Sequence, residues 1–194
     1  MVTKIGFAFI IFVIAIQRFF ELKKSRRHES DLKKQGGLEH APGHFYIMVS
    51  IHTAWFISMY LEVYILNRPF YLSLFMIATC FAVLGNWLRY QSMKALGPRW
   101  TVRIITIANH EPVTTGIYKY LRHPIYLGVI LEIAFIPLLH TAYLTAIFFS
   151  LANAILLKKR IYEEEKALNT INNYQNSFQN KPSLIPNFKN ISKP

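Results

Sequence analysis

Apolar residues in this chain fall into long blocks, over residues 5–20, 45–66, 70–88 and 125–157. A helix needs about 20 residues to cross the hydrocarbon core of a bilayer. The last block is longer than one such helix requires, and Pro137, His140 and Thr141 near its middle favour a tight turn. The pattern therefore predicts five membrane-spanning helices, over residues 3–22, 45–66, 70–90, 124–139 and 142–159.

Composition agrees with a membrane protein. Apolar residues make up 53% of the 194-residue chain and charged residues only 16%, against about 25% in soluble domains. The net charge is +12, but a soluble nucleic-acid-binding protein would not combine such a charge with so much Phe and Tyr, so we expect no nucleic-acid partner. A single cysteine, Cys80, excludes a disulfide framework, and no histidine pair has metal-ligand spacing, so we expect no metal site.

The basic residues are distributed unevenly between the two sides of the predicted bundle. Of the 22 Lys and Arg residues, all but Lys4, Arg18 and Arg68 fall on one side. Short loops rich in Lys and Arg stay in the cytoplasm. We therefore expect a multi-pass protein of the lipid bilayer, with its N-terminus outside and its C-terminus and polar C-terminal tail in the cytoplasm.

Residues 91–123 form a connection too long for an ordinary loop, and such long connections are usually functional or disordered. It contains the β-branched run 101–107 and leads into Arg122-His123-Pro124 at the start of the fourth predicted helix. Proline is favoured in the first turn of a helix, and free backbone N–H groups at a helix N-terminus attract anions. The sequence thus predicts an anion site flanked by two basic side chains.

The end of the fifth predicted helix carries charges of the opposite sign. Arg160 and Glu164 are neighbours at i,i+4 on a continuous helix, and Glu163 and Glu165 flank the acid. If the last two helices form an antiparallel hairpin, these acids return to the membrane face that holds Arg122. Basic, acidic and aromatic groups would then converge at the interface, which suits a zwitterionic ligand with a cationic centre and an aromatic ring.

At these residues the chain resembles the isoprenylcysteine carboxyl methyltransferase family and its phospholipid methyltransferase relatives. The resemblance covers residues 90–190 and rests on Leu96-Gly97-x-x-Trp100, Gly116-Ile117-Tyr118, Arg122-His123-Pro124-x-Tyr126-x-Gly128, Arg160-x-x-x-Glu164-Glu165-x-x-Leu168, Tyr174 and Leu184-Ile185-Pro186. It implies S-adenosylmethionine as cofactor, bound between the long loop and the cytoplasmic ends of the last two helices. It also implies a hydrophobic acceptor that enters from the bilayer.

The first ninety residues resemble a bacterial branch of this family, which implies a bacterial cell membrane. The matching residues are Arg18-x-x-Glu21-Leu22, Ser25-x-x-x-x-Ser30 and Gly36-Gly37-x-Glu39-x-x-x-Gly43-His44. Some members of that branch are associated with polyketide synthases and methylate the ring hydroxyl of long-chain pyrones. The extra N-terminal spans of the eukaryotic enzymes are lacking, which weakens the case for a prenylated-protein substrate.

We accordingly expect an all-α integral membrane protein in two parts. Residues 1–90 would form three helices on the acceptor side, and residues 91–194 a catalytic part with a cofactor-binding loop and a C-terminal helical hairpin. Arg160 and Glu164 are the candidate catalytic residues, and Trp100 and Glu132 the candidate acceptor-binding residues. The candidate S-adenosylmethionine-binding residues are Tyr118, Arg122, His123, Pro124, Tyr126, Gly128, Glu164 and Glu165.

Each of these positions also has a purely structural interpretation. Arg122 belongs equally to the basic flank that sets topology, and the tyrosines to the interfacial aromatic belt. Gly128 suits close helix packing, Arg160 and Glu164 an ordinary salt bridge, and Glu132 a buried ion pair.

The predicted function is O-methylation of a lipid-like acceptor, with an isoprenylcysteine-type carboxylate first. Methylation of the ring hydroxyl of an alkylpyrone or phenolic lipid and N-methylation of a phospholipid are the alternatives within the enzyme class. A non-catalytic membrane scaffold is the alternative outside it.

Overall fold

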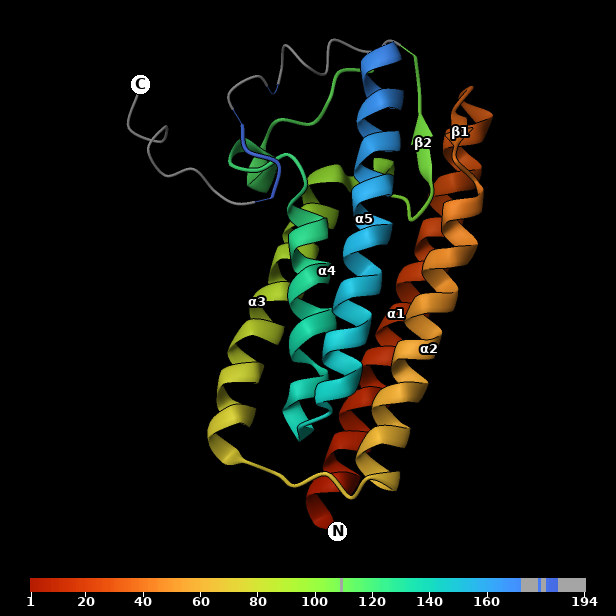
Figure 1. Ribbon diagram of the computed structural model, residues 1–194. Helices are drawn as coiled ribbons and strands as arrows, with labels where there is room; N and C mark the ends of the chain where they lie inside the picture. Colours follow the sequence, from red (N-terminus) through yellow and green to blue (C-terminus); the bar gives the residue numbers. More distant parts are fainter. Residues whose placement is uncertain (109, 172–177, 179–180, 185–194) are drawn as a thin grey trace.

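The computed structural model describes residues 1–108, 110–171, 178 and 181–184. Its five helices are α1 (Val2–Lys34), α2 (Gly43–Ile65), α3 (Leu72–Leu96), α4 (Pro124–Phe135) and α5 (Tyr143–Ile171). The helices run roughly side by side, and residues 97–123 gather at the end of the bundle opposite the N-terminus, which we call the loop end (Figure 1). Three short 3-10 helices interrupt the connections: η1 (Gly97–Arg99), η2 (Gly116–Lys119) and η3 (Pro137–His140).

The predicted all-α, five-helix architecture is confirmed, but the helices differ in length from the prediction. Within the described residues, three helices are long and apolar enough to cross a membrane: α1, α2 and α3. The 12 residues of α4 reach only about 18 Å, short of a bilayer core of about 30 Å, and the turn after it lies above the lower ends of α1 and α2 in Figure 1. The last two predicted spans thus form a hairpin of unequal arms, with α4 short and α5 29 residues long.

The turn of this hairpin lies where the sequence placed it. Pro137 to His140 form η3, and Thr141 adopts the left-handed conformation with φ of 56° before α5 begins. The first N–H groups of a helix have no partner within it. Glu62 of α2 supplies one, because its carboxylate accepts hydrogen bonds from the N–H of Leu144 at 3.1 Å and of Thr145 at 2.7 Å. This carboxylate therefore anchors the start of α5 to α2.

Small residues let α3 and α4 pack closely. A Cβ atom added to Gly128 of α4 would lie 2.6 Å from the carbonyl oxygen of Gly85 and 2.6 Å from Cγ of Arg89, both on α3. Glycines at such contacts are typical of helices packed in membranes. Gly128 is therefore a helix-packing position in this structure.

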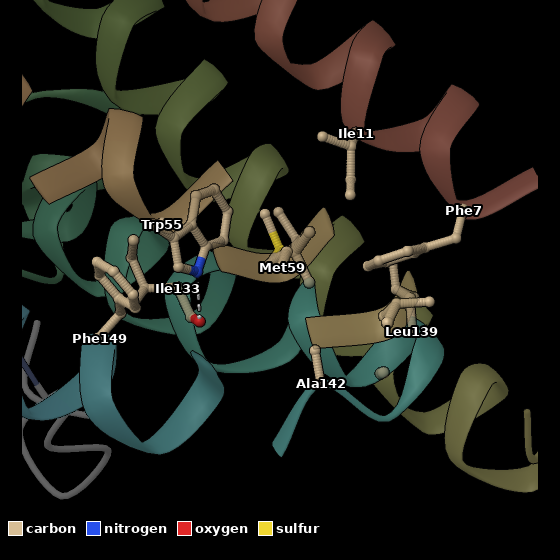
Figure 2. Close-up of a cluster of buried hydrophobic side chains, with 11 residues drawn as sticks. Phe7, Ile11, Trp55, Met59, Ile133, Leu139, Ala142 and Phe149 are labelled. Carbon is tan, nitrogen blue, oxygen red and sulfur yellow. Dashed lines mark hydrogen bonds between the residues drawn. The ribbon is translucent and has the colours of Figure 1, made fainter. Parts of the chain in front are cut away.

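The apolar core lies toward the N-terminal end of the bundle, where all five helices meet (Figure 2). Trp55 packs there with Met59, Ile133 and Phe149, and its indole N–H donates to the carbonyl of Ile133 at 3.3 Å. Many large apolar side chains face outward instead, as expected of a surface in contact with lipid.

Two short strands at the loop end depart from the predicted all-helical chain. The strand β1 (Leu38–His40) pairs antiparallel with β2 (Ile104–Thr106), which comes from the β-branched run in the long loop. Ahead of β1, α1 continues to Lys34 instead of ending near residue 22 as predicted. This extension brings the charged end of α1 alongside the long loop.

Gly128→Ala is expected to destabilise the protein by about 1–3 kcal/mol, because the new methyl group would overlap the backbone of α3. Gly6→Ala is the matched control, since nothing lies within 4 Å of its Cβ position in α1. There alanine is expected to leave stability unchanged or raise it slightly. Thermal unfolding of both variants in detergent checks this, and equal melting temperatures would contradict the close contact.

Candidate functional site

One large cavity, with a volume of about 630 Å³, lies inside the loop end of the bundle. Its walls come from α1 and α2 on one side and from α4 and α5 on the other, and residues 99–107 and 110–113 close it at the loop end. Charged residues from four helices line it together with apolar ones: Arg18, Glu21, Arg89, Glu132, Arg160 and Glu164.

Arg160 and Glu164 meet across the hydroxyl group of Tyr126. The buried guanidinium of Arg160, 5% exposed, donates from Nε to Tyr126 Oη at 2.9 Å and from Nη2 to the carbonyl of Val102. Tyr126 in turn donates its hydroxyl proton to the Glu164 carboxylate. Since all four residues line the cavity, this chain of hydrogen bonds places the i,i+4 pair of α5, one tyrosine of α4 and the long loop around one point.

A second acid of α5 holds the residues that precede α4. Glu165 lies 3.1 Å from Nη1 of Arg122 and 2.9 Å from Nε2 of His123, whose ring stacks on Tyr126 with centroids 5.5 Å apart. The hydrogen bond from His123 lowers the pKa of the Glu165 carboxyl, although partial burial opposes the shift. The pair therefore stabilises the fold at neutral pH, and this contribution is lost as the pH falls through the lowered pKa of Glu165.

The backbone at the start of α4 is less open to an anion than the sequence predicted. The N–H groups of Arg122 and His123 donate to the carbonyls of Pro182 and Ser183, both at 3.0 Å. Pro124 has no N–H group. An anion at this helix start would therefore rely on side chains, and Nε of Arg122 is buried with no hydrogen-bond partner in the described part of the chain.

The cavity brings together most of the predicted site residues but not all of them. Seven of them line it: Trp100, Tyr118, Arg122, Tyr126, Glu132, Arg160 and Glu164. His123 and Glu165 lie behind this wall and bond to each other, Pro124 begins α4, and Gly128 packs on α3. Tyr174, Ile185 and Pro186 of the family motif lie outside the described residues.

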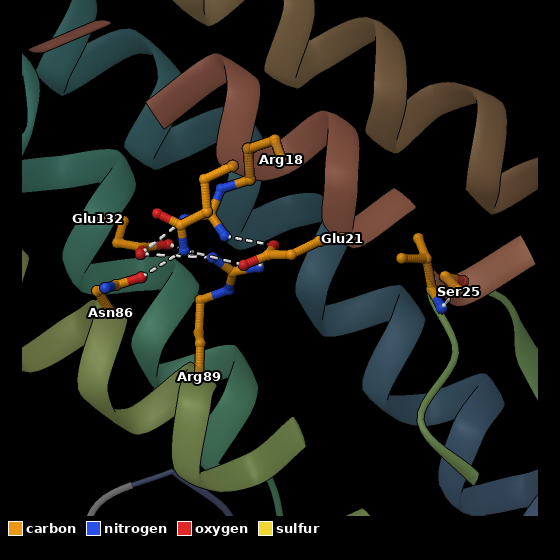
Figure 3. A network of polar contacts seen from close by, with 8 residues as sticks. Arg18, Glu21, Ser25, Asn86, Arg89 and Glu132 are labelled. Carbon is orange, nitrogen blue, oxygen red and sulfur yellow. Dashed lines mark hydrogen bonds and ion pairs between the residues drawn. The ribbon is translucent and has the colours of Figure 1, made fainter. Parts of the chain in front are cut away.

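Glu132 belongs to a group of four charged side chains, the charge cluster, formed by Arg18, Glu21, Arg89 and Glu132 (Figure 3). Arg18 lies 2.7 Å from both carboxylates, and Arg89 lies 2.5 Å from Glu21 and 3.2 Å from Glu132. Two positive and two negative charges thus balance within the bundle. The cluster ties α1 to α3 and α4.

Sequence reasoning missed the residues by which α1 holds the long loop. Ser25 is fully buried, donates to Glu29 at 2.6 Å and accepts a hydrogen bond from the N–H of Val102 at 2.8 Å. His28 bonds through Nδ1 to the carbonyl of Trp100 at 2.7 Å. Ser25 is part of the motif Ser25-x-x-x-x-Ser30, and its place in that motif is the one feature of the sequence that could have identified it.

Arg103 of the loop also ties the loop to the N-terminal part of the chain. Its guanidinium pairs with Glu29 and Glu39 and lies 4.1 Å from the ring centroid of Phe45. Burial raises the pKa of Glu39, but hydrogen bonds from Lys33 and Arg103 outweigh this and lower it. The loop is therefore fixed over the cavity by carboxylates of α1 and β1 and by an aromatic ring of α2.

The cavity also reaches the outer surface between α1 and α2. Phe19 of α1 and Ile57 of α2 line it and yet are 65% and 55% exposed. Both side chains are apolar and lie on helices long enough to cross a membrane. An apolar chain can enter at this side opening, whereas the charged groups lie deeper in the cavity and at the loop end.

Comparison with known proteins identifies the family of the chain. A sequence model of the isoprenylcysteine carboxyl methyltransferase (ICMT) family matches residues 76–170. An uncharacterized protein of Bacillus subtilis, YpbQ, is 37% identical over 163 residues, which are 84% of this chain and 96% of that protein. The chain belongs to the ICMT family. A second uncharacterized relative, from Haemophilus influenzae, is 27% identical over 80% of this chain and 90% of its own length.

A solved structure shows the same fold. The eukaryotic intramembrane Ras methyltransferase ICMT superimposes with a TM-score of 0.52 and 25% sequence identity, over 77% of this chain and 54% of that one. This ICMT-family chain thus spans about half the length of the eukaryotic enzyme. The matched region of the family, residues 76–170, contains α4, most of α5 and the loop that closes the cavity.

Removing one member of the charge cluster is expected to cost about 3–5 kcal/mol, because a buried charge loses its partner. Arg89→Met leaves two acids and one base, and Glu132→Met leaves the reverse. The double variant keeps only the Arg18–Glu21 pair, so its charges balance again and most of the loss is expected to be recovered. The free energies of unfolding of the natural protein, the two single variants and the double variant, measured in detergent, form a double-mutant cycle. If the loss in the double variant equals the sum of the two single losses, the charge cluster is contradicted.

Proposed function

We propose that this protein is an S-adenosylmethionine-dependent methyltransferase that acts on an acidic or hydroxyl oxygen of a lipid-like acceptor. The observation that carries the proposal is the single cavity, which connects the Arg160–Tyr126–Glu164 group with the apolar side opening at Phe19 and Ile57. A polar donor and an apolar acceptor need such a space with two chemically different ends. Membership of the ICMT family supports the same reaction.

The residues at the loop end of the cavity fit the chemistry of S-adenosylmethionine, which supplies a methyl group on a positively charged sulfur. Arg122 has a buried N–H without a partner in the described chain, which suits a carboxylate. Glu164 offers a carboxylate to a cationic group, and the aromatic rings of Tyr118, Tyr126 and Trp100 offer surfaces for a purine or a sulfonium. Charge and shape of the lining therefore match both ends of this cofactor.

The protein's own task in such a reaction is positioning and the exclusion of water. Arg160 is held at two points, by Tyr126 and by the carbonyl of Val102, so its charge stays fixed at the cavity wall. A fixed positive charge orients an anionic acceptor oxygen without the cost of rearrangement. A carboxylate acceptor then needs no base, whereas an enol or phenol requires removal of its proton.

Among acceptors, the family name favours an isoprenylcysteine-type carboxylate, and the bacterial branch favours the ring hydroxyl of an alkylpyrone or phenolic lipid. A phospholipid amine ranks after both, because the cavity lining places a positive guanidinium at the proposed reaction centre. In all cases the acceptor would enter from the bilayer through the side opening.

The proposed orientation puts the loop end in the cytoplasm and the N-terminus outside. Most basic residues in the described part of the chain lie in the loop-end halves of α1, α3 and α5 or in the connections at that end. Lys4 and Arg68, at the opposite end, hydrogen-bond to Asn67 and Glu62. The distribution follows the positive-inside rule, and it gives the methyl donor access from the cytoplasm.

Purified protein in detergent is expected to bind S-adenosylmethionine saturably. Glu164→Gln should weaken binding about tenfold or more through loss of a charge at the cavity wall, and His123→Ala should weaken it by releasing Tyr126 and Glu165. Glu163→Gln makes the same chemical change one residue away, outside the cavity lining, and should bind like the natural protein. Isothermal titration calorimetry measures all four proteins.

Two results of this titration would contradict the enzyme proposal. The first is an absence of saturable binding by the natural protein, which would favour a non-catalytic membrane scaffold. The second is binding that is unaffected by both Glu164→Gln and His123→Ala, which would place the donor elsewhere.

The chemical class of the acceptor is open to a direct test. Incubation with methyl-labelled S-adenosylmethionine and a bacterial membrane-lipid extract is expected to label a lipid, and alkaline treatment then separates the classes. A methyl ester releases labelled methanol, whereas a methyl ether or an N-methyl group keeps the label. Label that is retained under base would contradict a carboxylate acceptor, and label recovered in a phospholipid amine would contradict O-methylation.

A further inference from the structure

Asn153 carries a buried polar atom that has no hydrogen-bond partner within the described part of the fold. It lies on α5 in the cavity wall and is 2% exposed, and its Oδ1 has no hydrogen-bond partner among the residues that the structure describes. A buried polar atom without a partner lowers stability, and a leucine of similar size would avoid this loss. The unpaired amide group of a residue in the cavity wall therefore points to a ligand that pairs with it.

His52 of α2 offers a second hydrogen-bond acceptor at nearly the same depth. Its Nδ1 lies 2.9 Å from the carbonyl oxygen of Met48, which only accepts, so Nδ1 holds the proton and Nε2 of the neutral ring keeps its lone pair. The antiparallel helices α2 and α5 touch at Ser58 and Thr145, whose hydroxyl oxygens are 2.9 Å apart. Counting from there toward the loop end, six residues reach His52 and eight reach Asn153, a difference of about 3 Å.

The charged residues of this layer are already engaged with one another. Arg18 and Glu132 line the same cavity, but each is bound in the charge cluster, where positive and negative charges balance. A ligand at this depth therefore meets no net charge. The amide of Asn153 and the imidazole of His52 are left to recognise it, beside the hydroxyl group of Thr53 on the same helix as His52.

We propose that Asn153 and His52 form a headgroup subsite, which binds a hydroxyl group of the lipid acceptor that is additional to the oxygen receiving the methyl group. Two hydrogen-bond acceptors at one depth require a donor, and a hydroxyl group also complements the NH₂ group of Asn153. An acceptor-only group such as a second carboxylate would pair only with the NH₂ group of Asn153 and would leave Nε2 of His52 without a partner. This inference rests on the lipid acceptor of the proposed function, but it does not depend on methyl transfer.

The geometry gives the acceptor a compact headgroup. Asn153 lies seven residues from Arg160 on α5, about 10 Å along the helix axis, which leaves room for a ring between the subsite and the reaction centre. Phe19 and Ile57 mark the side opening through which the lipid tail would leave. The acceptor is thus a lipid whose small head carries a hydroxyl group in addition to the oxygen that receives the methyl group.

Binding of two commercial lipids that differ by one hydroxyl group tests the subsite without any methyl transfer. The full chain in detergent is titrated with pentadecylresorcinol and with meta-pentadecylphenol, and tryptophan fluorescence reports the Kd. The natural protein is expected to bind the resorcinol about tenfold more tightly, a difference typical of one buried hydrogen bond. Asn153→Leu is expected to abolish the preference, and His52→Phe to reduce it.

The thermal stability of the ligand-free protein separates a binding role of Asn153 from a structural one. If Asn153 serves the fold, Asn153→Leu lowers the Tm, and if it serves a ligand, the substitution raises it. Asn153→Leu removes an unpaired buried group, so the Tm of the ligand-free protein is expected to rise, by about 2–4 °C. Asn169→Leu, the same change at an exposed position of α5, should leave the preference for the resorcinol intact.

Two outcomes would overturn the subsite. One is a preference for the resorcinol over the phenol that is equal in the natural protein and in Asn153→Leu. The same holds if neither protein prefers the resorcinol. The other is a lower Tm for Asn153→Leu, which would give Asn153 a structural role. The proposed function fails separately, through the absence of S-adenosylmethionine binding, and that result would leave the lipid titration and its outcome unchanged.

Discussion

The arrangement of this bundle depends on four charges that neutralise one another inside it. Isolated charges within a membrane segment are costly, so Arg18, Glu21, Arg89 and Glu132 are tolerated only in contact. Their mutual distances of 2.5–3.2 Å draw α1 toward α3 and α4 and fix its depth relative to both. With α1 held there, α1 and α2 stand opposite α4 and α5, and the cavity lies between the two pairs.

The same helix also controls the loop-end side of the cavity. The extension of α1 carries Ser25 and His28, which hold the backbone of the long loop at Val102 and Trp100. That loop in turn fixes Arg160 through the carbonyl of Val102. One helix therefore positions both the wall of the cavity and the guanidinium at its centre, which explains why motif residues in the first ninety positions matter for a site formed largely by the last hundred.

Local patterns in the sequence predicted the local parts of the structure. Apolar blocks located α1, α2 and α3, Pro137 located the hairpin turn, and the i,i+4 spacing placed Arg160 beside Glu164. Hydropathy failed where a helix leaves the apolar region, because residues 23–34 are charged and still helical. Hydropathy and local spacing do not predict contacts between distant residues. The ion pair of Arg18 and Glu132 could not be predicted, because 114 positions separate the two residues.

The N-terminus of α4 illustrates the same limit at the site itself. Arg122-His123-Pro124 correctly marked a helix start. No pattern in the sequence indicated that the carbonyls of Pro182 and Ser183 accept hydrogen bonds from the backbone N–H groups of Arg122 and His123. In the proposed function, recognition of an anion there would pass to the side chain of Arg122. The residues of the motif thus divide into those that line the cavity and those, such as His123, that support its wall.

An experimental structure of the protein in a lipid nanodisc with S-adenosylhomocysteine bound tests the central claim most directly. The account predicts the ligand inside the cavity, with its carboxylate near Arg122, its sulfur facing the Arg160–Tyr126–Glu164 group and an open path from there to Phe19 and Ile57. A ligand bound outside this cavity, or a cavity closed off from the bilayer in the bound state, would contradict it.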